Sequence, residues 1–219
     1  MKQLGLVLVI LIMSFSLAIG CQESEQAPAQ DKLPSLNNDL RSGKLTLHHQ
    51  ISHDGVDFVT TYSTNYDASK WRITSSKALL MEADVTASGV DVLVEHVHAD
   101  ISILSKLAAV DGLSQDSMDD SIHGGSQPGF ATPYSEVFAI EGYSETLISG
   151  WGFVAGGYGA SSLSEERLTE CNLRDEGEAY GQKLQVVYDL AIRYTGEDFF
   201  HTHSIIDEFV VPLAKDIGC

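Results

Sequence analysis

Two short histidine pairs have the residue type and spacing of metal ligands. The first is His96-Val97-His98, which Asp100 follows, and the second is His201-Thr202-His203. Each pair lies in a segment that we expect to be a strand, where alternate side chains project from one face. His96 and His98 would then lie about 7 Å apart at the backbone and could bind one ion. Imidazoles with few thiols favour zinc or copper. The alternative is that both pairs are polar residues of a solvated sheet face.

An acidic segment offers oxygen ligands. We expect a short helix near residues 115–123, which Ser114 would cap and Gly124 would end. Four side chains would share one face of that helix, at i, i+3, i+4 and i+7: Asp116, Asp119, Asp120 and His123. They could add ligands to the histidine site, and the carboxylates alone would suit calcium, which is the less expected metal. The alternative is a solvated face of a small surface helix.

A third segment, from Gly150 to Gly159, alternates glycines with aromatic residues. Trp151, Phe153 and Tyr158 could form a stacking platform for a sugar. The alternative is a strand or hairpin in which glycine permits close packing. The chain contains no Walker A, G-x-S-x-G or H-E-x-x-H motif, and so no residue is predicted to be catalytic.

Period-two hydrophobic alternation predicts the elements that would position these residues. Residues 183–194 alternate apolar with polar side chains, and the turn at 196–198 leads into residues 199–211, so we expect a hairpin. Further strand-like runs occupy residues 44–51, 57–62, 73–76, 80–86 and 90–103. Without any β-α-β alternation, this pattern predicts an all-β fold. We expect an antiparallel β-sandwich, immunoglobulin-like or jelly-roll, with the one short helix near 115–123.

The N-terminus indicates export. Lys2 precedes an uncharged apolar run from Leu4 to Ile19, which is typical of a signal peptide. The run ends in Leu17-Ala18-Ile19-Gly20-Cys21, which resembles the lipobox of bacterial lipoproteins. This resemblance implies cleavage before Cys21, a lipid on its thiol and a membrane-anchored exported protein. It also implies the outer membrane if the host is Gram-negative, because Gln22 and not Asp follows.

We therefore divide the chain into three parts: a lipoprotein signal peptide over residues 1–20, a disordered polar tether over residues 21–39, and one β-sandwich domain over residues 40–219. Lipidation of Cys21 leaves Cys171 and Cys219. Because exported proteins meet an oxidising compartment, we expect these two residues to form a disulfide.

The chain is strongly acidic, since 31 Asp and Glu oppose 13 Lys and Arg for a formal net charge of −18. No Lys or Arg occurs between Lys106 and Arg167. This balance argues against nucleic acid as a partner, because binding it requires clustered positive charge. It is compatible with a soluble exported domain or with a surface that collects cations.

Two functions from different classes follow. The first is a cell-envelope lipoprotein that binds zinc or copper through His96, His98 and an acid such as Asp100. The second is a metal-free binding or adhesion module of the cell surface, whose protein or glycan partner the sequence does not identify. A weaker alternative is a metal-dependent enzyme, because His96-Val97-His98 and His123-Gly124-Gly125 resemble fragments of copper–zinc superoxide dismutases.

We predict that Cys21→Ala abolishes lipid attachment and signal-peptide cleavage, because the thiol that would carry the lipid is lost. Labelling cells with palmitate and measuring the mass of the purified protein checks this. Cys219→Ala should keep the label and serves as the control. A Cys21→Ala protein that still incorporates palmitate would show that the lipobox interpretation is wrong.

Overall fold

The computed structural model describes residues 35–51, 56–86, 89–108, 110–121, 130–142, 170–175 and 177–215. The chain divides into two compact units, Met1–Leu33 and Pro34–Cys219, and all described residues belong to the second. Several predicted residues lie outside the described ranges, and the predictions about them stay predictions: Cys21, His123, Trp151, Phe153, Tyr158 and Cys219.

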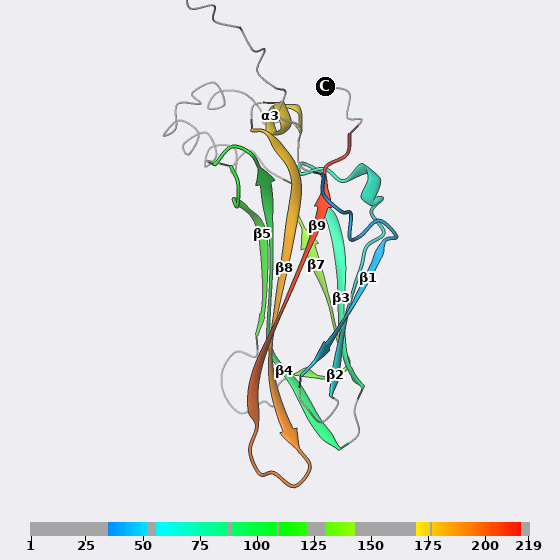
Figure 1. Cartoon of the computed structure of the whole chain (residues 1–219), viewed down its shortest axis with the longest axis vertical. Helices are drawn as coiled ribbons and strands as arrows, with labels where there is room; N and C mark the ends of the chain where they lie inside the picture. Colours follow the sequence, from blue (N-terminus) through cyan, green and yellow to red (C-terminus); the bar gives the residue numbers. More distant parts are fainter. Residues whose placement is uncertain are drawn as a thin grey trace, which may run out of the picture. The chain divides into compact units, whose positions relative to one another are not determined.

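Two antiparallel sheets pack face to face as a β-sandwich, which confirms the predicted fold class (Figure 1). One sheet has the order β1-β2-β3-β7, with β1 (Lys44–Gln50), β2 (Asp57–Ser63), β3 (Lys77–Thr86) and β7 (Tyr134–Ile140). The other has the order β5-β4-β8-β9, with β4 (Val90–Ser105), β5 (Ser114–Ser121), β8 (Ala179–Tyr194) and β9 (His201–Pro212). The short strand β6 (Phe130–Ala131) adds to β4.

The predicted hairpin is confirmed as β8 and β9, which pair antiparallel from Gly181 opposite Pro212 to Ile192 opposite His201. Alternate residues of β8 are buried in the core, in agreement with the alternation read from the sequence. The turn between the two strands contains Gly196 at φ +88°, a left-handed conformation that glycine adopts without strain.

The core lies between the sheets, and aromatic residues from both sheets meet there. Phe58 of β2 contacts Tyr188 of β8 edge to face, with ring centroids 5.6 Å apart. Tyr62 of β2 packs against Phe209 of β9 at 4.7 Å. All four rings are buried, and burial of apolar area of this kind is the main force that holds two sheets together.

The predicted helix near residues 115–123 is wrong. Residues 114–121 form β5, which pairs antiparallel with β4 and sets Asp119 opposite His98. The pairing satisfies the edge of β4, and Met118 packs against the core. Ser and Asp are weak helix formers, and so strand pairing outweighs the local preference.

The described short helix is instead α3 (Glu170–Asp175), and it explains a second wrong prediction. Residues 73–76 were expected to form a strand, but the backbone N–H groups of Ile73 and Thr74 donate to the buried carboxylate of Glu170 at 3.1 and 3.0 Å. The Glu170 carboxylate thus accepts hydrogen bonds that the backbone of a neighbouring strand would otherwise accept. Cys171 also lies in α3. Among the helices of the described residues, none has the length and apolarity needed to cross a bilayer.

A buried carboxylate links the two sheets. Asp207 of β9 is 2% exposed and accepts hydrogen bonds from the hydroxyls of Thr60 and Tyr62 on β2, at 2.6 and 2.5 Å. Nε2 of His49 on β1 lies 2.8 Å from the other carboxylate oxygen. Burial raises the pKa of Tyr62, which keeps its hydroxyl protonated as a donor. Two hydroxyl donors thus contact one oxygen of the buried carboxylate, and an imidazole lies beside the other.

We predict that Asp207→Ala lowers the free energy of unfolding by about 3 kcal/mol, because it leaves buried hydroxyl donors without an acceptor. Urea unfolding followed by circular dichroism measures the change. The control is Thr202→Ala, an exposed position of the same strand, which should change stability by no more than about 0.5 kcal/mol. Equal unfolding midpoints for Asp207→Ala and the wild type would contradict this account of the sheet contact.

Candidate functional site

Strand β4 places its polar residues on the outer face of its sheet, as the alternation predicted. His96, His98 and Asp100 are half-buried there, while the intervening Val97 and Ala99 are fully buried in the core. The histidine pair is therefore anchored by the core side of its own strand but remains open to solvent.

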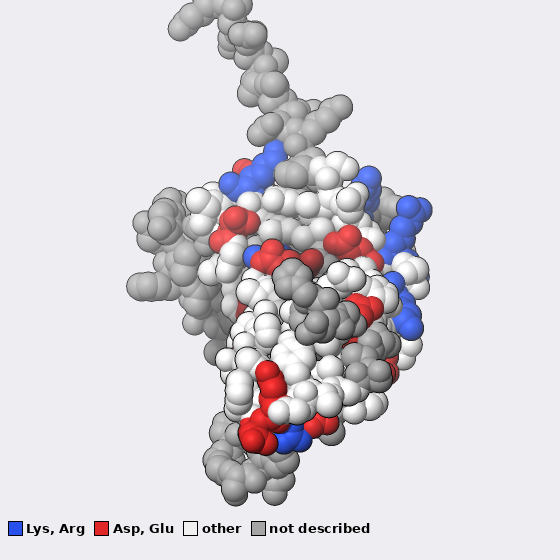
Figure 2. Space-filling model, turned by 60° about the horizontal axis from the view of Figure 1, so that its bottom comes forward, with Lys and Arg blue, Asp and Glu red and all other residues white. Residues whose placement is uncertain are grey.

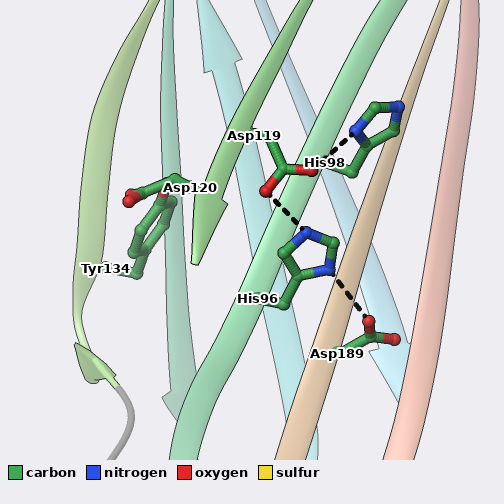
Figure 3. A network of polar contacts seen from close by, with 6 residues as sticks. All are labelled: His96, His98, Asp119, Asp120, Tyr134 and Asp189. Carbon is green, nitrogen blue, oxygen red and sulfur yellow. Dashed lines mark hydrogen bonds and ion pairs between the residues drawn. The ribbon is translucent and has the colours of Figure 1, made fainter. Parts of the chain in front are cut away.

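A row of polar contacts crosses all four strands at His96. Figure 3 shows its part from Asp119 to Asp189. Nε2 of His96 lies 3.0 Å from Oδ1 of Asp119 on β5, and Nδ1 lies 3.1 Å from Oδ2 of Asp189 on β8. The hydroxyl of Ser204 on β9 donates to Oδ1 of Asp189 at 2.6 Å. We call Asp119, His96, Asp189 and Ser204 the polar ladder.

A bulge in β4 sets the register of the polar ladder. Val94 lies opposite Leu190, but the next paired residue is His96, which lies opposite Asp189. The intervening Glu95 is the extra residue of a β-bulge, a feature that changes which side chains face each other across a sheet. The ion pair of His96 with Asp189 thus depends on one extra residue in β4.

His98 joins the polar ladder through Asp119. Its Nδ1 lies 3.4 Å from Oδ2 of Asp119, and its ring lies 6.4 Å from the ring of His96 between centroids. One carboxylate therefore contacts both imidazoles, as Figure 3 shows. Two nitrogen donors and one carboxylate from adjacent strands meet on an open face.

The carboxylates favour the protonated form of His96. The hydrogen bond to Asp189 is the largest cause that raises the pKa of His96; burial, the second largest effect, lowers this pKa, and Asp119 raises it further. In return, the hydrogen bond with His96 lowers the pKa of Asp119. The Ser204 hydroxyl, followed by His96, lowers the pKa of Asp189. A metal ion would compete with the proton on His96, because only the neutral imidazole binds metal.

The other predicted acidic ligands do not join this group. Asp116 and Asp120 lie on the face of β5 opposite to Asp119, so the shared helix face that the sequence suggested does not exist. Asp120 accepts a hydrogen bond from the Tyr134 hydroxyl at 3.0 Å, and Asp116 accepts the backbone N–H of Glu141 at 2.7 Å.

Asp100 is on the same outer face as the histidine pair but has a different contact. Its carboxylate accepts a hydrogen bond from the hydroxyl of Ser114 at 2.6 Å. It therefore lies beside the polar ladder without contacting it in any described interaction.

The second histidine pair lies on the other side of the sheet. His203 and His201 are paired with Leu190 and Ile192, whose side chains are in the core, and so both imidazoles face away from Asp189. Nε2 of His201 lies 2.8 Å from a carboxylate oxygen of Glu197. The structure does not bring the two His-x-His pairs together.

Over the described ranges, no three His, Cys, Asp or Glu side chains already surround a common ion position. Asp119 fills the space between the two imidazoles and holds them through hydrogen bonds and ion pairs. Sequence reasoning missed Asp189, whose only sequence signal is its place as an outward-facing acid in the middle of a long predicted strand.

Comparisons with known proteins identify no family. No protein-family model matches the chain, and no curated protein matches it. One similar solved structure is a crystal structure of a protein from Archaeoglobus fulgidus, with 12% sequence identity, coverage of 81% of this chain and 97% of that chain, and a TM-score of 0.29. A likeness of that size carries no argument about function.

We predict that His96 titrates above the ordinary imidazole value of 6.5 and that Asp189→Asn lowers its pKa, because the amide carries no charge. Since the pKa is raised on folding, protonated His96 stabilises the fold at low pH, and this contribution is lost as pH rises through the folded-state pKa. Imidazole proton resonances in NMR give the titration. The backbone resonances of β1 and β2, on the other sheet, should not shift and serve as the control. An unchanged His96 pKa in the Asp189→Asn variant would refute the interaction between His96 and Asp189.

Proposed function

We propose that this protein is an exported, lipid-anchored protein that binds a divalent transition metal, zinc or copper, on the outer face of its β5-β4-β8-β9 sheet. The observation that carries the proposal is the single Asp119 carboxylate in contact with both His96 and His98, at 3.0 and 3.4 Å. The proposed ligands are Nε2 of His96, Nδ1 of His98 and an oxygen of Asp119.

The contact with Asp189 supports this assignment. Metal-binding histidines usually donate the N–H of their second ring nitrogen to a carboxylate, which fixes the tautomer and the ring orientation. Nδ1 of His96 has such a partner in Asp189 at 3.1 Å. With Nδ1 protonated, the lone pair of Nε2 points towards Asp119 and His98, where the ion would be bound.

The site needs only a local rearrangement to accept an ion. The side chains of His98 and Asp119 are 41% and 57% exposed, so they can turn without disturbing the core. Zinc–nitrogen and zinc–carboxylate bonds are about 2.0–2.2 Å, and the metal would therefore replace the hydrogen bond between His96 and Asp119 with two shorter bonds.

A metal-free binding module is the second candidate, and an apolar side chain beside the polar ladder favours it. Ile206 of β9 is 59% exposed and is paired with Val187, which is itself paired with His98 on the other side. An exposed isoleucine next to half-exposed imidazoles suits a protein or glycan partner.

The lipid anchor at Cys21 and the Cys171–Cys219 disulfide belong to the same proposal. The apolar run and the lipobox support the anchor, and the anchor would make the membrane a partner. The oxidised state of Cys171 supports the disulfide, because lipidation of Cys21 leaves Cys219 as the other available thiol.

We predict that the untagged mature protein binds zinc or copper(II) at one saturable site and that His96→Ala/His98→Ala abolishes binding. Asp189→Asn should weaken affinity by about tenfold, since it removes the partner that orients the ligand. Because the pKa of His96 is raised, affinity should begin to fall at a higher pH than it would for a site built from ordinary imidazoles. Calorimetric titration at several pH values measures all three effects.

His48→Ala is the matched control, because His48 is 64% exposed and pairs with an aspartate, but lies on the other sheet. Its affinity should equal that of the wild type. A wild type without a saturable site, or a His96/His98 variant that binds as tightly, would replace the metal proposal with the metal-free module.

A further inference from the structure

A pocket of about 560 Å³ lies beyond the C-terminal end of β9, where three distant segments of the chain meet. Asn38 contributes from the segment before β1. The 3₁₀ helix η1 (Ala68–Lys70) and Arg72 contribute from the β2–β3 connection. The third side is the stretch from Pro212 to Lys215. This pocket shares no lining residue with the polar ladder.

Hydrogen bonds between these segments hold the pocket open in one shape. The N–H of Ala214 donates to the carbonyl of Trp71 at 2.9 Å, and the Asn38 amide donates to the carbonyl of Ala68 at 3.2 Å. Arg174 of α3 donates to the carbonyl of Ala214 at 2.7 Å. Each wall is thus fixed to a neighbouring segment, so a ligand would meet a preformed site.

The pocket is cationic although the chain is strongly acidic. Lys70, Arg72 and Lys215 line it. Asp67 lies 3.4 Å from Lys70, but its carboxylate also accepts two hydrogen bonds from Ser69. In the part of the chain that the structure describes, no ion pair engages Arg72 or Lys215.

Lys and Arg side chains are few on the face shown in Figure 2, where they lie mainly along the upper and right-hand margins and at the lower edge, while Asp and Glu side chains are spread across it. Positive charge is scarce in this chain, and so its concentration around one pocket favours an anionic ligand.

The lining suggests what kind of anion fits. Ala68, Leu213 and Ala214 form an apolar floor and are 5–7% exposed. The Arg72 guanidinium can donate two parallel hydrogen bonds to two oxygens of one group, a geometry that matches phosphate. Pockets of this size hold small molecules rather than single ions.

We propose that this pocket binds a phosphate group carried on a larger molecule, either the head group of an anionic phospholipid or a soluble phosphate ester. The proposal is independent of the metal site. Asn38, near the end of the expected tether, lines this pocket. The proposed lipid at Cys21 would hold the protein at a membrane, where phospholipid head groups are present.

The test uses residues 21–219 with Cys21→Ser, expressed without the signal peptide, so that neither an acyl chain nor the uncleaved apolar run contributes to vesicle binding. One arm titrates glycerol 3-phosphate by calorimetry at constant ionic strength. The other arm measures co-sedimentation with phosphatidylcholine vesicles that contain or lack phosphatidylglycerol. The variant Arg72→Gln/Lys215→Gln should lose about tenfold in affinity in the arm that binds, and Lys215→Gln alone should lose less.

The matched control is Lys183→Gln/Arg193→Gln, which removes the same positive charge from residues paired with Glu208 and Asp91 elsewhere. It should bind as the wild type does. Binding to glycerol 3-phosphate identifies a soluble ester, and binding only to phosphatidylglycerol vesicles identifies a head group. Absence of saturable binding in both arms, or an equal loss in the control, would overturn the proposal.

Discussion

The antiparallel pairing of β4 with β8 is the constraint on which the rest of this structure depends. It runs from Val90 opposite Tyr194 to Ser105 opposite Ala179 and forms the centre of one sheet. One face of this pair supplies much of the core, and the other face presents His96 to Asp189. Because both faces belong to the same two strands, a slip of one residue would expose the core and break the polar ladder together. The bulge at Glu95 therefore sets the register on which both the core and the candidate site depend.

Acidic residues have different roles in the core and on the outer face of the sandwich. Asp207 is buried between the sheets, where it contacts two hydroxyl donors of β2 and His49 of β1, and its role is to hold the sheets in contact. Asp119 and Asp189 lie on the outer face, where a half-exposed imidazole is their main charged partner. A buried carboxylate held by hydrogen bonds stabilises the fold, whereas an exposed one next to an imidazole can exchange that partner for a proton or a metal ion.

Local alternation predicted the parts of the structure that depend on one strand at a time. The all-β class, the β8–β9 hairpin and the common face of His96, His98 and Asp100 all follow from a period of two. What the sequence alone did not supply is the identity of the neighbouring strand. The weak helical pattern of residues 114–121 gave way to pairing with β4. Asp189 lies 93 residues from its partner His96, and only the register of the sheet brings them together.

The most direct test of the proposed metal site is a crystal structure of the zinc-soaked protein with an anomalous difference map at the zinc edge. We expect a peak on the outer face of the β5-β4-β8-β9 sheet, about 2.0–2.2 Å from Nε2 of His96 and from an oxygen of Asp119. The contact of Nδ1 with Asp189 should persist. A map without a peak on that face, or one in which Nε2 of His96 still hydrogen-bonds to Asp119, would contradict the proposed site.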